Sequence, residues 1–343
     1  MSKIKAHKGA PYARIIGVGG YRPVRVVPND VILEKIDSSD EWIRSRSGIE
    51  TRHWANDEET VAAMSVEAAG KALADAGIGA ERIGAVVVST VSHFAQTPAV
   101  ATEIADKLGT DKAAAFDISA GCAGFGYGLT LAKGMVVEGS AEYVLVIGVE
   151  RLSDLTDLED RATAFLFGDG AGAVVVGPAH EPHIGPTVWG SEGDKSETIK
   201  QTLPWNAYRV GDLSALPVDD EGNLKFPAIT QEGQAVFRWA VFEMAKVAQQ
   251  ALDAAGISAD DLDVFIPHQA NVRIIDSMVK TLKLPEHVTV ARDIRTTGNT
   301  SAASIPLAME RLLATGEAKS GDTALVIGFG AGLAYAATVV TLP

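Results

Sequence analysis

Two pairs of similar segments lie about 180 residues apart in this chain, and they limit the folds that it can adopt. ALADAGIGAERIGAVVVS (72–89) aligns without a gap with ALDAAGISADDLDVFIPH (251–268), and GSAEYVLVIGVE (139–150) aligns with KSGDTALVIGFG (319–330). The first pair has the pattern of a helix end, a glycine stop, an acidic turn and a buried strand. Two matches at nearly the same spacing indicate an internal duplication.

Each half contains short apolar segments that are predicted to be strands covered on both faces: 85–88, 144–147, 264–266 and 324–327. Because such strands belong to sheets with helices on both sides, the sequence predicts an α/β fold with at least partly parallel sheets. The duplication divides the chain into residues 1–184 and 185–343. Residues 185–230 show no counterpart in the first half, so we expect them to form an inserted, loop-rich cover near the surface.

The composition of the chain argues against several classes of protein. The chain has 30 Lys and Arg against 44 Asp and Glu, a formal net charge of −14, which argues against nonspecific binding to nucleic acid or an anionic membrane. Its single cysteine excludes an intrachain disulfide and is typical of a reducing compartment. No apolar run approaches the roughly 18 residues that span a bilayer, and the N-terminus lacks the apolar core of a secretory signal. We expect a soluble, cytoplasmic protein.

The single cysteine, Cys122, lies in SAGCAGFGYG, where an apolar run gives way to a helical pattern. A helix N-terminus favours a thiolate, so the sequence predicts a nucleophile at this position. In the second half, His268 ends a predicted strand and Asn299 lies at the start of the equivalent helix. Histidine and asparagine can together stabilise an enolate or an oxyanion, and the duplication would bring all three side chains to the centre.

Each of these residues also has a purely structural interpretation. A buried cysteine is usually an inert small hydrophobic side chain. The histidine of PHQAN could be a strand-end residue with its hydrogen bonds satisfied, and TTGNTSAAS could be a helix cap. Their positions at related joints of the duplication favour the catalytic interpretation.

Four motifs carry a resemblance to a known family: DISAGCAGFGYGL, PHQANVRIID, TGNTSAASIPLA and GFGAGLAYAA. They resemble the active-site motifs of the 3-oxoacyl-(acyl-carrier-protein) synthase III family, and the similarity extends over essentially the whole chain. The resemblance implies a thiolase-like fold of five layers, αβαβα, with two duplicated halves, and normally a homodimer. It also implies a catalytic triad of Cys122, His268 and Asn299. A short acyl-CoA would acylate the cysteine, and malonyl-ACP would then lose CO2 and condense with that acyl group, without a cofactor.

The resemblance assigns further residues. The oxyanion hole would use the backbone N–H groups of Cys122 and Ala331, the latter at a position where many relatives have glycine. The positions that hold the CoA are Trp42, Arg46, Arg161 and Asn271. The cations that face the acidic carrier protein are Arg238, Arg273 and Lys280. Thr97 falls where some relatives place a phenylalanine that shortens the acyl pocket, which implies room for branched or longer primers.

Several alternatives stay open at this stage. The arginines and the lysine could be ordinary solvated residues, and Asn271 could be a helix cap. A related enzyme that primes a polyketide or another specialised product would use the same chemistry. A degradative thiolase would typically need a second cysteine, and a noncatalytic acyl-binding scaffold would not need the triad. The glycine-rich GFGAGLAY does not open a helix as a dinucleotide fingerprint does, and HEPH (180–183) lacks further ligands at metal-binding spacing, so we expect no NAD and no metal.

Overall fold

The computed structural model describes residues 4, 8–210, 216–218, 222 and 224–343. The strands of the first half are β1 (Tyr12–Tyr21), β2 (Arg25–Pro28), β3 (Thr51–Trp54), β4 (Ile83–Ser89), β5 (Ala114–Ile118), β6 (Tyr143–Arg151) and β7 (Asp169–Ala179). Its helices are α1 (Asn29–Leu33), α2 (Asp40–Ser47), α3 (Val61–Ala76), α4 (Val100–Leu108) and α5 (Gly124–Glu138).

The second half follows the same plan. Its strands are β8 (Val188–Ser191), β9 (Ile199–Gln201), β10 (Ile229–Gln231), β11 (Val264–Pro267), β12 (Thr289–Val290), β13 (Thr323–Gly330) and β14 (Ala334–Thr341). Its helices are α6 (Ala207–Val210), α7 (Gly233–Trp239), α8 (Ala245–Ala255), α9 (Val272–Leu282), α10 (Ile294–Thr297) and α11 (Ser304–Thr315).

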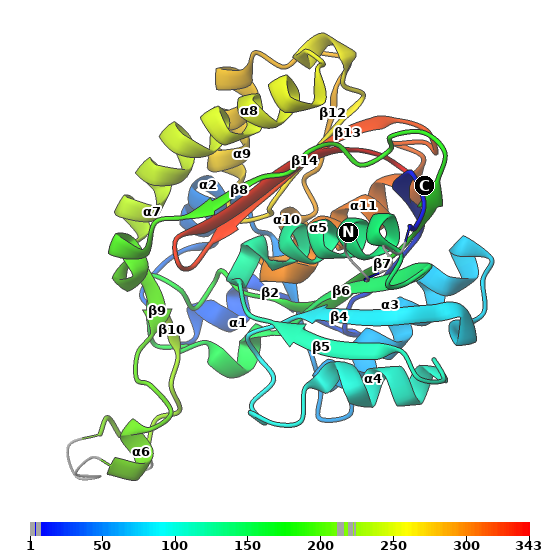
Figure 1. Cartoon of the computed structure of the whole chain (residues 1–343). Helices are drawn as coiled ribbons and strands as arrows, with labels where there is room; N and C mark the ends of the chain where they lie inside the picture. The colour runs from blue at the N-terminus through cyan, green and yellow to red at the C-terminus, as the bar shows by residue number, and fades with distance from the viewer. Residues whose placement is uncertain (1–3, 5–7, 211–215, 219–221, 223) are drawn as a thin grey trace.

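Two five-stranded sheets form the second and fourth layers of the molecule (Figure 1). Their strand orders are β1-β7-β6-β4-β5 and β8-β14-β13-β11-β12. Helices α3 and α4 cover the outer face of the first sheet, α8 and α9 cover that of the second, and α5 and α11 lie between the sheets (Figure 1). The αβαβα layering and the two similar halves confirm the fold that the sequence predicts.

The four predicted strands are present as β4, β6, β11 and β13, and they form the parallel part of each sheet: β4 pairs with β6 and β11 with β13. The pairs β4–β5 and β11–β12 are also parallel, whereas β6–β7, β1–β7, β13–β14 and β8–β14 are antiparallel. The predicted glycine stops are also present. Gly77 and Gly256 end α3 and α8 with φ angles of 66° and 72°, the left-handed conformation that glycine adopts without strain.

The central layer holds the two helices that lead away from the duplicated joints. Phe125 and Leu129 on α5 are fully buried, as are Ile305 and Met309 on α11. Burying a side chain of this size contributes about 1.5–3 kcal/mol, so the contact between the halves is a major part of the core. The position of α5 and α11 is therefore fixed by packing on both sheets.

One prediction about residues 185–230 is wrong. We expected no counterpart in the first half, but β8 pairs antiparallel with β14 and takes the edge position that β1 takes beside β7. Only four residues long, β8 carries too little sequence to reveal the match. The division predicted between residues 184 and 185 falls just before this strand.

The rest of that region forms an arm. Strands β9 and β10 pair, and the chain between them carries α6 away from the five layers (Figure 1). Phe94, Trp205 and Phe226 meet at ring distances of 5.1–5.5 Å beside the arm, and all three remain more than 40% exposed. Residues 211–215, 219–221 and 223 of the region lie outside the described part of the chain. No helix within the described residues is long and apolar enough to cross a membrane.

Candidate active site

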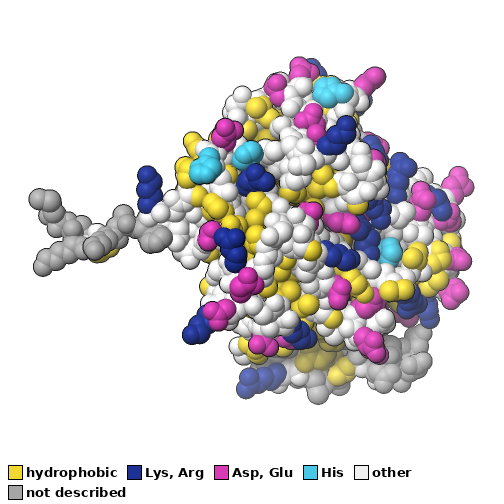
Figure 2. All heavy atoms as spheres, turned by 90° about the vertical axis from the view of Figure 1, so that its right-hand side faces the viewer, with side chains coloured by type: hydrophobic (Ala, Val, Ile, Leu, Met, Phe, Trp, Pro, Cys, Tyr) yellow, Lys and Arg dark blue, Asp and Glu magenta, His cyan; other side chains and the backbone are white. Residues whose placement is uncertain are grey.

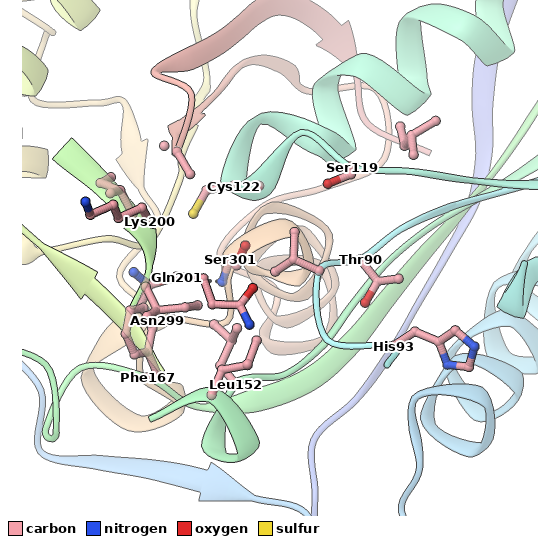
Figure 3. Close-up of a pocket in the computed structure, with 18 of the residues that line it drawn as sticks. Thr90, His93, Ser119, Cys122, Leu152, Phe167, Lys200, Gln201, Asn299 and Ser301 are labelled. Atoms are coloured by element: carbon pink, nitrogen blue, oxygen red, sulfur yellow. Dashed lines mark hydrogen bonds between the residues drawn. The ribbon is translucent and has the colours of Figure 1, made fainter. Parts of the chain in front are cut away.

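A cavity of about 680 Å³ lies where the strands of both sheets end. Its lining includes Cys122, His268, Asn299 and Ala331, together with residues of the arm such as Trp205. Figure 3 shows Cys122 and Asn299 among the side chains around the cavity. The structure therefore brings the whole predicted triad to one cavity. Strand ends and helix N-termini of the two halves face each other here, as expected for a ligand site in layered α/β sheets.

Cys122 lies in a 3-10 turn, Gly121–Ala123, directly before α5. The end of β13 packs against it so closely that a Cβ atom on Gly330 would lie 2.9 Å from the Cys122 Sγ atom. Only glycine leaves this approach clear. Ala331 follows, and its backbone nitrogen lies 3.5 Å from where a Cβ atom on Gly121 would be, so the second predicted oxyanion donor is beside the cysteine turn.

The surroundings of the thiol disfavour its charged form. Burial, opposed by a hydrogen bond with Ser301 and assisted by the negative charge of Glu150, raises the pKa of Cys122 to about 12. The helix N-terminus, which favours a thiolate, is therefore not the only influence on this sulfur. A nucleophilic attack by Cys122 needs a proton acceptor.

His268 follows β11 and is 2% exposed. Burial lowers the pKa of its imidazole to about 3, so the ring is neutral at physiological pH. Its Nδ1 atom lies 2.7 Å from the Ser304 Oγ atom, which also accepts from the Gln269 N–H at 3.4 Å. The tautomer that accepts at Nδ1 from the serine hydroxyl has its proton on Nε2, and in this form the ring can donate a hydrogen bond into the cavity. Phe329 fixes the ring from the side, edge to face at 5.4 Å.

Asn299 is anchored through its backbone to the opposite half. Its N–H donates to Leu166 O at 2.9 Å, and its carbonyl accepts from the Gly168 N–H at 3.0 Å. The side-chain Oδ1 atom accepts from the Ser301 N–H at 2.9 Å, which leaves Nδ2 as the amide atom that can donate into the cavity. His268 and Asn299 together thus offer two neutral donors beside Cys122.

The duplication places these groups slightly differently from the prediction. The 3-10 turn Ser301–Ala303 before α11 corresponds to Gly121–Ala123 before α5. Ala302 therefore occupies the position of Cys122 in the second half, and Asn299 precedes the turn. The two copies have diverged, one supplying a nucleophile and the other hydrogen-bond donors.

Comparison with known proteins identifies the family. Residues 116–193 match the family model for 3-oxoacyl-[acyl-carrier-protein (ACP)] synthase III, and residues 252–342 match the model for its C-terminal part. The chain is 91% identical over 343 residues to beta-ketoacyl-[acyl-carrier-protein] synthase III 1 of Streptomyces coelicolor, covering 100% of both chains. The chain belongs to the 3-oxoacyl-[acyl-carrier-protein] synthase III family.

More distant members of the synthase III family agree over the full length. A beta-ketoacyl-[acyl-carrier-protein] synthase III of Mycobacteroides abscessus is 52% identical, covering 100% of this chain and 98% of that protein. Among solved structures, the priming beta-ketosynthase from the R1128 polyketide biosynthetic pathway superposes with a TM-score of 0.93 at 44% identity, covering 100% and 99% of the two chains. The Aquifex aeolicus synthase III gives a TM-score of 0.84 at 36% identity, covering 96% and 99%. A synthase III is a condensing enzyme of the acyltransferase class.

Three of the residues predicted to hold CoA meet at the surface of this synthase III. Trp42 on α2 is half-buried, and the Cζ atoms of Arg161 and Arg46 lie 5.0 and 6.0 Å from the centre of its ring. Phe165 supports the same ring edge to face at 5.5 Å. Both guanidinium groups are exposed and lie outside the lining of the cavity.

The fourth predicted CoA residue has a structural role. Asn271 caps α9: its Oδ1 atom accepts from the Arg273 N–H at 2.9 Å, and its Nδ2 atom donates to the Arg46 carbonyl at 3.0 Å. The Asn271 amide thus caps α9 with its oxygen and joins α9 to α2 with its nitrogen. This is the capping alternative that the sequence left open, and Asn271 does not line the cavity.

The predicted carrier-protein residues lie on two neighbouring helices. Arg238 is on α7, while Arg273 and Lys280 are on α9, and all three are exposed. The Arg273 Cζ atom lies 4.9 Å from the Phe237 ring of α7. Within the described residues, none of the three cations forms an ion pair with an acidic side chain. On the face at the right of Figure 1, away from α7, acidic and basic side chains are instead interspersed (Figure 2).

Thr97 is exposed and is not part of the cavity lining of its own chain, although its neighbours Ala95, Gln96 and Ala99 are. Sequence reasoning missed Ser304, Phe329 and Gly330, which hold the histidine and clear the cysteine. The repeated motifs contain these residues, but their roles depend on contacts across the chain. No group of three or more His, Cys, Asp or Glu side chains in the described ranges could hold a metal ion.

Proposed function

We propose that this chain is the synthase that starts fatty-acid chains: it joins a short acyl group from acyl-CoA to malonyl-ACP and releases CoA and CO2. The observation that carries the proposal is the meeting of Cys122, His268 and Asn299 at one cavity that is large enough for an acyl group and its thioester arm. Such a reaction needs a nucleophile that holds the acyl group and neutral donors for an enolate oxygen. The proposed reaction needs no cofactor. The free thiol of Cys122 is typical of a protein in the reducing cytoplasm.

The proposed chemistry has two stages. The Cys122 sulfur forms a bond to the carbonyl carbon of the acyl-CoA while the bond to the CoA sulfur breaks, and backbone N–H groups of Cys122 and Ala331 bind the oxyanion. Malonyl-ACP then loses CO2, and its thioester oxygen becomes negative as the enolate forms. The Nε2–H of His268 and the Nδ2–H of Asn299 stabilise that oxygen, and the enolate carbon attacks the acyl group on Cys122.

Mass spectrometry tests this proposal directly. Incubation with a short acyl-CoA is expected to add the mass of one acyl group at Cys122, and malonyl-ACP is expected to remove it as 3-oxoacyl-ACP. No mass gain with any acyl-CoA would contradict the proposal. Release of 3-oxoacyl-ACP would exclude the scaffold alternative, because an acyl-binding subunit without turnover would not form this product.

A second candidate function has a specific basis. The structural similarity to the priming ketosynthase of a polyketide pathway is high, so a role in starting a specialised product would use the same site. Comparing the rates with carrier proteins of fatty-acid and polyketide synthesis separates the two functions.

We further propose that Arg238, Arg273 and Lys280 bind the acidic carrier protein. Their lack of ion pairs within the described residues leaves these cations available, and a positive patch on a chain of net charge −14 would steer an acidic partner. We also propose a homodimer, in which Thr97 and the exposed aromatic cluster of Phe94, Trp205 and Phe226 lie near the partner.

Replacing Arg161 with alanine is expected to raise the KM for acyl-CoA about tenfold with little change in kcat. The guanidinium group and the Trp42 ring form a site for an adenine or a phosphate, and loss of one such contact costs about 1–2 kcal/mol. Arg44→Ala is the matched control: it lies on the same helix as Trp42 but is engaged with Asp40 and Glu50. Equal effects of both substitutions would show a general charge effect instead of a binding site.

The Thr97→Phe variant tests the acyl pocket. If Thr97 reaches the pocket of a partner subunit, the larger ring is expected to lower kcat/KM for isobutyryl-CoA at least about tenfold while acetyl-CoA is still used. Wild-type protein is expected to use both primers. A strict preference of the wild type for acetyl-CoA would contradict the size argument.

A further inference from the structure

Arg52 is a buried cation for which the reaction proposed above has no role. It lies on β3, is 0% exposed, and forms no ion pair with any carboxylate among the described residues. Burial lowers the pKa of its guanidinium group to about 10, while the negative charge of Asp40 opposes this shift, so the group is charged at physiological pH. A buried charge is costly, and its presence here needs an explanation.

The guanidinium group joins three segments of the first half by hydrogen bonds. Its Nη1 atom donates to the Val27 carbonyl of β2 at 3.2 Å. Its Nη2 atom donates to the Asn29 Oδ1 atom at the start of α1, at 2.5 Å, and to the Phe165 carbonyl at 3.0 Å. The planar fork of an arginine donates in several fixed directions, so Arg52 holds Phe165 at a defined distance from α1 and β2.

The acceptor at the start of α1 is itself fixed. Asn29 is 2% exposed, and its Nδ2 atom donates to the Asp40 Oδ1 atom at 2.7 Å and to the Ile49 carbonyl at 3.0 Å. Asp40 is the first residue of α2, and its carboxylate is thus connected to Arg52 through one amide side chain. The guanidinium group therefore rests on a rigid base on this side.

On the other side, the segment that Arg52 holds carries Asn299. The Asn299 N–H donates to the Leu166 carbonyl at 2.9 Å, and the Gly168 N–H donates to the Asn299 carbonyl at 3.0 Å. These two bonds form a parallel bridge between Phe167 and Asn299, and both side chains line the cavity (Figure 3). A movement of the Phe165 carbonyl would therefore be passed to the backbone of Asn299.

The stem of Arg52 packs against the same bridge. A Cβ atom on Gly168 would lie 3.3 Å from the Arg52 Cβ atom, and a Cβ atom on Gly298 would lie only 2.8 Å from it. Gly298 also has a φ angle of 73°, which glycine adopts without strain. The residue before Asn299 thus lacks a side chain where Arg52 approaches it, and the arginine contacts the bridge both through its stem and through its guanidinium group.

We propose that Arg52 is a positioning residue for the second stage of the reaction: it holds residues 165–168, and these hold Asn299 so that its Nδ2–H points to the enolate oxygen. The inference rests on the proposed function and deepens it. Arg52 does not line the cavity, so it acts only through Asn299. Such an effect can be large, because a misplacement of about 1 Å in a reacting geometry can lower a rate about 100-fold.

The test measures the two stages separately: acyl-adduct formation at Cys122 in a single turnover, and release of CO2 from malonyl-ACP. Arg52→Met keeps an unbranched side chain in place but removes the charge and the donors. It is expected to lower CO2 release about 10- to 100-fold, because Asn299 is no longer held in place. The acylation rate is expected to stay within about twofold of the wild type, since no enolate forms in the first stage.

A double variant distinguishes positioning from a general loss of structure. If Arg52 acts through Asn299, Arg52→Met in an Asn299→Ala background is expected to lower the remaining CO2 release by less than about twofold. Losses that multiply in the double variant would show that the two residues act independently, and would overturn the inference.

Lys133→Met provides the matched control. Lys133 on α5 is likewise a partly buried cation without an ion pair in the described part of the chain, and its Nζ atom donates to the Gly185 carbonyl at 2.8 Å. It does not line the cavity. Both stages are expected to proceed at the wild-type rate in this variant, and a selective loss of CO2 release equal to that of Arg52→Met would overturn the inference.

Wild-type CO2 release in Arg52→Met would also overturn it, as would equal losses in both stages. If Arg52→Met does not fold, Arg52→Lys takes its place, because it keeps the charge and loses the fork. This variant is expected to lose about three- to tenfold in CO2 release alone, and no loss or equal losses in both stages would contradict the inference. The proposed function fails separately, because it requires only that the wild type gains an acyl group at Cys122.

Discussion

Replacement of Cys122 with alanine is expected to remove all acyl-adduct formation and to lower condensation at least about 1,000-fold. The chain has no second cysteine, so no other thiol can take over the acyl group. Cys122→Ser is expected to behave similarly, since a buried hydroxyl is a far weaker nucleophile than sulfur. Intact-protein mass spectrometry after incubation with acyl-CoA measures the adduct, and product assays measure the condensation.

The control for this variant is a reaction that does not need the sulfur. His268 and Asn299 remain in place in Cys122→Ala, so malonyl-ACP should still lose CO2 in this variant. Retained decarboxylation would show that the cavity is folded. Substantial condensation by Cys122→Ala would rule out the covalent route.

The second prediction with a large expected effect distinguishes the roles of His268 and Asn299 from that of Cys122. His268→Ala and Asn299→Ala are each expected to lower condensation about 100- to 1,000-fold, because each removes one hydrogen bond to the developing enolate oxygen. Acylation of Cys122 is expected to be affected less than condensation in both variants, because the enolate oxygen that the two donors stabilise forms only in the second stage. Rapid-quench mass spectrometry of the adduct and release of CO2 from malonyl-ACP measure the two stages separately.

Two outcomes would contradict these roles. Condensation at the wild-type rate in both variants would show that the enolate is stabilised by other groups. Loss of acylation in His268→Ala would make the imidazole the base for the thiol. The variants at Cys122, His268 and Asn299 therefore assign acylation and decarboxylation to different side chains.

Much of the fold could be predicted because the same sequence pattern occurs in both halves of the chain. The segments 72–89 and 251–268 repeat the helix stop and the buried strand, and both are found as predicted in α3–β4 and α8–β11. The meeting of Cys122, His268 and Asn299 at one cavity follows from their places at related joints. Local patterns suffice here because glycine stops and apolar strands act over a few residues.

Features that depend on distant contacts could not be predicted. Strand β8 is defined by its pairing with β14, almost 150 residues later, and not by its own four residues. The hydrogen bond between His268 and Ser304 joins residues 36 positions apart. The burial that raises the pKa of Cys122 involves residues of both halves around the cavity, which no single motif contains. Asn271 shows the converse case, since a local capping pattern was present and proved to describe its hydrogen bonds.

The anchoring of Asn299 to Leu166 and Gly168 has a consequence for the history of the molecule. A symmetric ancestor made of two identical copies could have carried the same site twice, once at each turn. In the present chain one turn carries the sulfur of Cys122 where the other has Ala302. Neither half could now replace the other, because each supplies a group of the site that the other lacks.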